Sequence, residues 1–235
     1  MFLHFTEDSY EKALIGLFQS MGYEYAYGPD IERNYQEPYY LNQVWASLPI
    51  VNPSKHQNAI AEAIKKLTNI DSGDLAQKNG IFMDYLQNGI PVAYHNGKEI
   101  RHDIVYLIDY ENTHRNTFQI INQWTYVEKS AKRADLIVFV NGLPLVLIEL
   151  KSPSREETDA SAAYRQIKNY MFEIPSMFTY NAFCVMSDMM CSKAGTITSS
   201  EDRFMEWKTK DGSYESTQYA DYDTFFEGIF PKDRL

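Results

Sequence analysis

The stretch from Leu136 to Ile148 constrains the fold of this chain more than any other, because it is almost entirely apolar and is interrupted near its centre by Asn141-Gly142. Asn-Gly is a strong signal for a tight hairpin turn, and the Pro that follows shortly after is compatible with one. Short apolar runs on both sides of a turn are typical of buried strands. The sequence therefore predicts a buried β-hairpin.

Charged residues stand at the open end of this predicted hairpin. Asp135 precedes the first strand, and Glu149 and Lys151 close the second. If Val140 pairs with Pro144, Asp135 lies opposite Glu149, whereas a shift of one residue would send one carboxylate to the other face. Glu149 and Lys151 are two residues apart on a strand, so they share a face. We expect two carboxylates and one ammonium group to converge at the edge of an apolar sheet.

These three groups suit one chemistry in particular. Two carboxylates bind Mg²⁺, which prefers oxygen ligands and retains several waters. A bound metal ion acidifies water and neutralises charge on a phosphate, and a lysine stabilises the charge that develops during hydrolysis. The alternative is a solvated strand end that carries an ordinary Glu–Lys pair.

A helix is predicted after the hairpin, over residues 156–173, with Ser152-Pro153-Ser154 as turn and cap residues. Gln166 and Tyr170 are four residues apart and therefore lie on one face of it. They are candidates for contacting DNA or the carboxylates. The alternative is an amphipathic helix with Tyr170 packed in the core.

The motif Asp135…Glu149-Leu150-Lys151 resembles the PD-(D/E)xK nuclease signature, and the later Gln166…Tyr170 resembles the additional motif of type I restriction enzyme R subunits. Similar segments extend over nearly the whole chain: Glu11, Gly22-Tyr23, Gly89-Ile90-Pro91-Val92, Ile108 to Asn112, Asn116-Thr117-Phe118 and Asn122-Gln123. The Pro that usually precedes the Asp is Ala134 here, which removes no ligand.

The resemblance implies an α/β fold with a restriction-endonuclease-like core, in which helices flank a central mixed β-sheet. It implies that Asp135, Glu149 and the backbone carbonyl of Leu150 bind Mg²⁺, for which Mn²⁺ can substitute. Lys151 would assist hydrolysis, and Gln166 and Tyr170 would position DNA. Glu11 would reach the site from the first helix, although a solvated helix face is the alternative.

The resemblance also implies partners. An R subunit joins methyltransferase and specificity subunits, moves double-stranded DNA with ATP, and cuts it without sequence preference. The chain has no Gly-x-x-x-x-Gly-Lys-[Ser/Thr] loop for ATP. We therefore interpret residues 1–235 as an N-terminal fragment of a longer motor subunit. The alternatives are a docking module without catalysis, a stand-alone nuclease, and a nuclease of the same fold that acts on RNA.

Composition agrees with an enzyme domain but does not identify one. The chain has 235 residues, of which 44% are hydrophobic, and a net charge of −10, which is unusual for a protein that binds DNA by itself. Basic residues gather near the predicted site, namely Lys129, Lys132, Arg133, Lys151, Arg155, Arg165 and Lys168. We expect weak DNA binding by a monomeric fragment.

The sequence lacks a signal peptide and any apolar run long enough to span a bilayer, so we expect a cytoplasmic protein of a bacterial or archaeal cell. Cys184 and Cys191 are expected to be reduced core thiols.

We expect one domain, with a helical N-terminal part over about 1–90 and a catalytic core over about 91–200. Helices are predicted over about 8–21, with Thr6 as a cap, over 55–68, with Ser54 as a cap, and over 74–88, and a loop over 29–41. Strands are predicted at 104–108, 118–121, 182–186 and 196–198.

Overall fold

The computed structural model describes residues 6–151, 160–188, 190–213 and 222–235, and a mixed six-stranded sheet lies at its centre. The order across this sheet is β1 (Glu24–Tyr27), β4 (Phe118–Val127), β5 (Ala131–Val140), β6 (Leu143–Leu150), β7 (Phe183–Ser187) and β8 (Ser192–Gly195). The β1–β4 and β6–β7 pairs are parallel, and the other pairs are antiparallel. A separate two-stranded sheet joins β2 (Ile90–His95) to β3 (Ile100–Val105).

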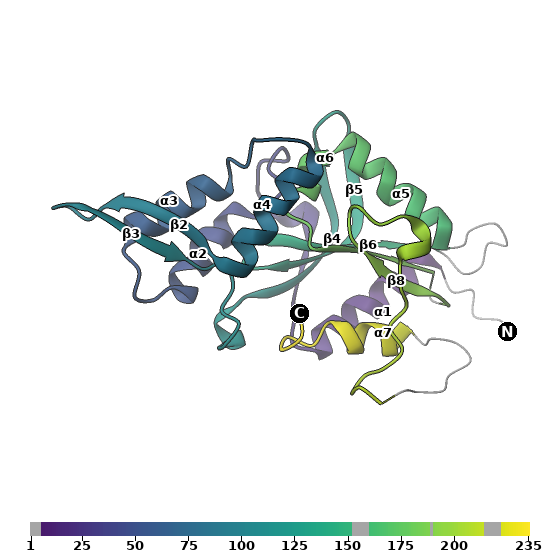
Figure 1. The fold of residues 1–235 in the computed structure, drawn as a ribbon. Coiled ribbons are helices and arrows are strands. Elements are labelled where there is room, and N and C mark those ends of the chain that lie inside the picture. The colour runs from purple at the N-terminus through teal and green to yellow at the C-terminus, as the bar shows by residue number, and fades with distance from the viewer. Residues whose placement is uncertain (1–5, 152–159, 189, 214–221) are drawn as a thin grey trace, which may run out of the picture.

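Helices cover both faces of the central sheet (Figure 1). On one face, α1 (Glu7–Ser20) and α7 (Tyr222–Ile229) bring Phe18 and Phe226 into a core that they share with β6. On the other face, α5 (Ala160–Glu173) and the short α6 (Pro175–Phe178) bury Ile167 against Ile137 and Leu147 of the hairpin. The predicted α/β fold of the restriction-endonuclease type is confirmed.

The Asn141-Gly142 turn joins β5 to β6, as expected. Both residues have positive φ values, 53° and 83°, as the turns favoured in hairpins require. A Cβ atom on Gly142 would lie 2.6 Å from the carbonyl oxygen of Tyr40 and 2.7 Å from the backbone nitrogen of Val44. The turn therefore needs glycine for two reasons, its backbone conformation and the helix start packed against it.

The pairing across this hairpin differs from the expected one at the turn but matches it at the open end. Val140 pairs with Leu143 rather than with Pro144, so that prediction is wrong. A β-bulge between Val138 and Phe139 then shifts the register by one residue. Beyond the bulge Leu136 pairs with Ile148, which is the predicted register and places the two carboxylates opposite each other.

The N-terminal region contains more than the predicted helices. The helices α3 (Gln57–Leu67) and α4 (Leu75–Asn88) lie where they were expected, and Thr6 caps α1 as predicted. The cap of α3 is His56, however, and not Ser54, since its side chain accepts the hydrogen bond of Asn58 N. An additional helix, α2 (Leu41–Val51), follows the loop region, and β1 forms one edge of the main sheet.

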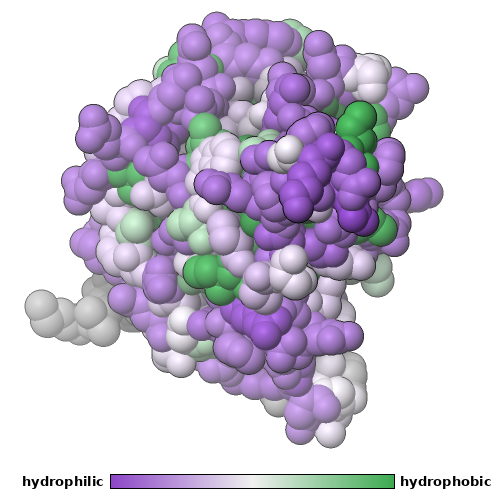
Figure 2. Space-filling view, turned by 90° about the vertical axis from the view of Figure 1, so that its left-hand side faces the viewer, coloured by the Kyte–Doolittle hydropathy of each residue, from purple (hydrophilic) through white to green (hydrophobic). Residues whose placement is uncertain are grey.

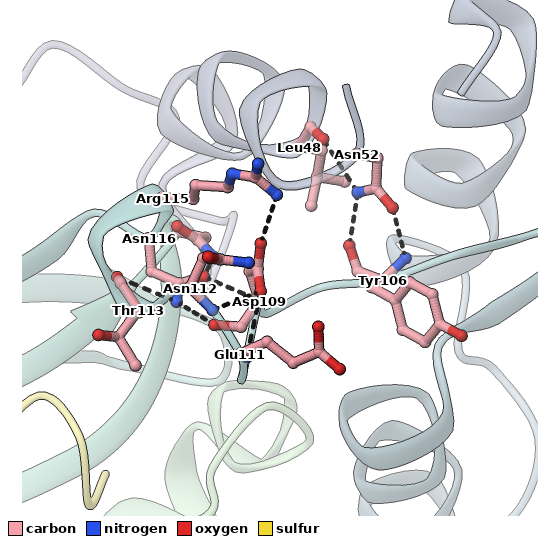
Figure 3. Close-up of polar contacts among 10 residues, drawn as sticks. Leu48, Asn52, Tyr106, Asp109, Glu111, Asn112, Thr113, Arg115 and Asn116 are labelled. Carbon is pink, nitrogen blue, oxygen red and sulfur yellow. Dashed lines mark hydrogen bonds and ion pairs between the residues drawn. The ribbon is translucent and has the colours of Figure 1, made fainter. Parts of the chain in front are cut away.

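The strand predicted over 104–108 is confirmed only at 104 and 105, because β3 ends at Val105, and the segment from there to β4 is a hydrogen-bonded connection. Figure 3 shows how it is held. The Asn52 side chain, at the end of α2, donates to the carbonyl oxygen of Tyr106 at 2.8 Å and accepts from its backbone nitrogen at 2.9 Å. The strand predicted at 196–198 is also absent, because β8 ends at Gly195.

The β2–β3 hairpin and α3 project from one end of the molecule (Figure 1). Figure 2 views this end and shows a mostly hydrophilic surface with scattered hydrophobic residues. Ile100, at the start of β3, is 68% exposed. No helix in the described part of the chain is long and apolar enough to cross a membrane.

Candidate active site

Asp135 lies where β5 separates from β6. The last residues paired between these strands are Leu136 and Ile148. One residue further on, the Oδ2 atom of Asp135 accepts the hydrogen bond of Leu150 N at 2.9 Å. A side-chain carboxylate thus occupies the place of a backbone acceptor, which fixes its position relative to the end of β6.

Glu149 and Lys151 form the second half of the site. Glu149 is fully buried in β6. The Lys151 Nζ atom donates to Glu149 Oε1 at 2.6 Å and to the carbonyl oxygen of Leu150 at 2.7 Å. The other carboxylate oxygen, Oε2, is buried and makes no hydrogen bond. A buried acceptor without a partner is costly, so this atom marks the position as more than structural.

The two acids hold protons more tightly than ordinary carboxyls. Burial, followed by the nearby charge of Asp135, raises the pKa of Glu149 to about 8. Burial also raises the pKa of Asp135 to about 6, although the Leu150 N–H and the charge of Lys151 oppose that increase. Two carboxyls that are close together in a desolvated place ionise reluctantly, and a cation between them would reverse that preference.

The oxygen atoms present fit a hard divalent cation. The Lys151 ammonium already bridges Glu149 Oε1 and Leu150 O, two of the three groups that the family resemblance implies for a metal ion, and Asp135 lies beside them. No group of three His, Cys, Asp or Glu side chains suited to a metal occurs among the described residues. Two carboxylates and a carbonyl suit Mg²⁺, which usually keeps several of its waters. Asp135, Glu149 and Leu150 O would hold it.

Gln166 and Tyr170 connect α5 to the strand that carries Asp135, and the alternative predicted for Tyr170, a position in the core, is confirmed. Tyr170 is only 4% exposed and belongs to the core. Its hydroxyl donates to the carbonyl oxygen of Arg133 at 3.0 Å and accepts from Gln166 Nε2 at 2.7 Å. After burial, the charge of Glu149 is the next cause of the raised pKa of Tyr170. The cap residues predicted at 152–154 lie outside the described residues.

Glu11 is buried, not on a solvated helix face. Its two carboxylate oxygens accept hydrogen bonds from the side-chain amides of Asn122 and Gln123, at 2.7 and 2.8 Å. No role for these amides was predicted from the sequence. The available signal was the pair of adjacent amides between the apolar residues Ile121 and Trp124.

The basic residues near the site are only partly available to a ligand. The ammonium groups of Lys129 and Lys168 donate to backbone carbonyls, of Phe172 at 2.7 Å and of Ile197 at 3.1 Å. Arg133 and Arg165 are exposed. Arg155 lies outside the described residues. Fewer cations face solvent than the sequence suggested.

A second acidic position shows what a structural carboxylate looks like in this chain (Figure 3). Asp109 accepts hydrogen bonds from Asn112 N and Glu111 N, and its Oδ2 atom is 3.0 Å from Arg115. The hydrogen bond from Asn112 N, followed by Arg115, lowers the pKa of Asp109. Both of its oxygens accept hydrogen bonds within the chain, whereas Glu149 Oε2 accepts none.

Cys184 is buried and Cys191 is half-buried, and neither forms a disulfide. The expectation of reduced thiols is met, although only Cys184 lies fully in the core.

The comparison with protein families agrees with this geometry. A family model described as the N terminus of the type I restriction enzyme R protein matches residues 4–203. The chain belongs to this family. The matched range includes every residue of the candidate site.

Individual relatives point the same way. The chain is 32% identical over 91% of its length to the type I restriction enzyme HindI endonuclease subunit of Haemophilus influenzae, and 29% identical over 96% to the putative MjaIXP endonuclease subunit of Methanocaldococcus jannaschii. It is 28% identical over 83% of its length to the EcoprrI endonuclease subunit of Escherichia coli. The chain spans 21% and 24% of the length of the first two relatives, and 67% of the third.

Proposed function

We propose that this domain hydrolyses DNA phosphodiester bonds at the site of Asp135, Glu149 and Lys151, with Mg²⁺ as cofactor and Mn²⁺ as a substitute. The observation that carries the proposal is Glu149. It is a fully buried acid with a raised pKa, an oxygen that makes no hydrogen bond, and a second acid and a lysine beside it. This arrangement is costly for a folded chain unless a cation uses it.

Each residue has a distinct role. Asp135 and Glu149 provide charged oxygens, and the Leu150 carbonyl provides a neutral one. The bound cation would acidify water and neutralise phosphate charge. The Lys151 ammonium, which is held at the edge of this oxygen set, would exchange its contact with Glu149 for the phosphate charge that develops during hydrolysis. Gln166 and Tyr170 keep α5 against the strand that carries Asp135.

The remaining roles belong to the whole subunit. We propose that the domain cuts double-stranded DNA without sequence preference after motor domains elsewhere in the subunit have moved the DNA with ATP. Methyltransferase and specificity subunits would deliver the substrate in the cytoplasm. The few exposed cations near the site and the net charge of −10 support this division of labour, because they provide little affinity for a duplex.

The test uses the full subunit assembled with its partners and a plasmid that carries the recognition site. Asp135→Ala, Glu149→Ala and Lys151→Ala should each abolish nicking and linearisation and leave ATP hydrolysis unchanged. Glu111→Ala, which removes an exposed carboxylate away from the site, should retain both activities. Cleavage by Asp135→Ala or Glu149→Ala would refute the site assignment. A wild-type complex that hydrolyses ATP but never cuts would favour the docking module.

A further inference from the structure

Both carboxylate oxygens of Glu11 accept a hydrogen bond from a side-chain amide. Asn122 Nδ2 donates to one oxygen of Glu11, and Gln123 Nε2 donates to the other. The Tyr25 hydroxyl donates to Asn122 Oδ1 at 3.1 Å, which fixes the orientation of that amide. The carboxylate of α1 is therefore held at both oxygens by consecutive residues of β4.

The backbone at Gln123 is in a conformation that side chains rarely adopt. Its φ is 55°, and apart from the turn residue Asn141 it is the only residue other than glycine with positive φ in the described part of the chain. Such a conformation costs free energy for a non-glycine residue and persists where the surroundings impose it, often at functional sites.

The neighbouring backbone imposes the positive φ of Gln123. Asn122 pairs with Leu136 and Trp124 pairs with Ala134, so Gln123 lies opposite Asp135 in the β4–β5 register. A Cβ atom on Gly28, in the turn after β1, would lie 2.7 Å from Asn122 O and 3.0 Å from Gln123 O. The irregularity in β4 is thus packed from one side by the turn after β1 and adjoins the catalytic Asp135 on the other.

Glu11 is held next to the strand position of Asp135. Gln123, whose Nε2 atom donates to Glu11 Oε2 at 2.8 Å, is the residue that lies opposite Asp135 in the β4–β5 register. Glu11 does not form a cluster of three metal-ligating side chains with Asp135 and Glu149. Each of its oxygens accepts one amide N–H and keeps a further lone pair. A water molecule bound to a cation is the partner that this arrangement suits.

We propose that Asn122 and Gln123 are positioning residues of the nuclease site, which hold Glu11 so that it accepts hydrogen bonds from water around the metal ion rather than binding the ion directly. The left-handed backbone of Gln123 aims the second amide. This inference rests on the proposed function, because it requires the metal site at Asp135 and Glu149.

A purely structural role for the two amides leads to a different expectation. If they only satisfy a buried carboxylate, their loss lowers stability and leaves cation binding unchanged. If they position Glu11, their loss weakens cation binding even where the fold does not suffer. Gln123→Gly separates the two cases, because glycine adopts positive φ without strain but carries no amide.

The experiment is a Mn²⁺ titration of the 235-residue chain, in which free Mn²⁺ is measured by its electron paramagnetic resonance signal and folding is checked by thermal melting. Gln123→Gly should melt at or near the wild-type temperature and bind Mn²⁺ about 10-fold more weakly, as losses of groups that orient metal-site residues do. Asparagine tolerates a positive φ, but its side chain is shorter than that of glutamine. Gln123→Asn should therefore also bind Mn²⁺ more weakly and melt near the wild-type temperature. Asn141→Gly, at the opposite end of the β5–β6 hairpin, is the matched control and should leave Mn²⁺ affinity unchanged.

A double-mutant comparison tests whether Gln123 acts through Glu11. In Glu11→Gln the further change Gln123→Gly should cost little additional Mn²⁺ affinity. Wild-type affinity in Gln123→Gly, together with loss of binding in Glu149→Ala, would overturn this inference alone. Unchanged binding in Glu149→Ala would overturn the metal site itself, and equal, additive losses from Glu11→Gln and Gln123→Gly would show that the two residues act separately.

Discussion

At the scale of single residues, Tyr170 combines two functions that are usually separate. Its ring fills the core beneath α5, and its hydroxyl holds the carbonyl oxygen of Arg133, two residues before Asp135. A substitution there changes packing and the position of the site together, so the size of the substitution determines which effect dominates.

We therefore expect Tyr170→Ala to lower the free energy of unfolding by about 3–5 kcal/mol, as truncations of buried aromatic side chains do. Tyr170→Phe keeps the ring and loses a hydroxyl bond, so it should cost only about 1 kcal/mol. Urea unfolding followed by circular dichroism measures both. A loss below about 1 kcal/mol in Tyr170→Ala would contradict the buried position of the ring.

The raised pKa values of Glu149 and Asp135 make stability depend on pH. The folded chain retains these protons at pH values where the unfolded chain has released them, so the metal-free chain should lose stability as the pH rises from about 4.5, the ordinary value of a Glu carboxyl, to about 8. The slope should be on the order of 1 kcal/mol per pH unit. Glu149→Gln, measured by urea unfolding across this range, should flatten it. An equal slope in that variant would contradict the assignment.

The convergence of Asp135, Glu149 and Lys151 could be predicted from the sequence, because these residues flank an apolar run that has a hairpin turn near its centre. The amides around Glu11 were not accessible, because their meeting depends on how α1 lies against β4. His56 rather than Ser54 caps α3, because the helix begins at Gln57 and not at residue 55.

At the scale of elements, the β5–β6 hairpin depends on both its turn and its bulge. The expected pairing failed at the turn and held at the open end, because the bulge after Val138 offsets the tighter two-residue turn. The edge strand β1 and the helix α2 were not predicted, because neither has a clear local sequence signal. β1 has only four residues, and α2 begins without a side-chain cap and contains Pro49.

Gly142→Ala should therefore destabilise the chain by at least about 2 kcal/mol, because it combines a positive φ with contacts to the backbone of Tyr40 and Val44. Gly16→Ala is the matched control. Gly16 lies inside α1, and a Cβ atom there would contact nothing within 4 Å. That change should stabilise the chain by about 0.5–1 kcal/mol. Thermal or urea unfolding of the two variants should give shifts of opposite sign.

At the scale of the whole molecule, the negative net charge opposes the binding of DNA that the proposed site requires. The proposed site would bind a cation and phosphate, but the chain as a whole carries a charge of −10. Two of the basic side chains that the sequence places near the site, Lys129 and Lys168, donate to backbone carbonyls. The remaining cations would therefore attract a duplex only locally and over a short range.

The isolated chain should bind duplex DNA weakly, with affinity that falls steeply between low and moderate salt, and should cut poorly by itself. Gel shifts at two ionic strengths, with Mg²⁺ replaced by Ca²⁺ to separate binding from cleavage, measure this. Tight binding that resists salt would show that the chain finds DNA without help.

The order of pairing in the central sheet has a consequence for how the protein is made. The β4–β5–β6 meander closes over short loops, whereas β1 reaches β4 by pairing residues as distant in sequence as Glu24 and Gln119. Closing a longer loop costs more entropy, so the meander should form early in folding and α1 with β1 should dock late. During synthesis, Asp135 and Glu149 would then be in place before Glu11 arrives, and the candidate site would lack this carboxylate until α1 docks against β4.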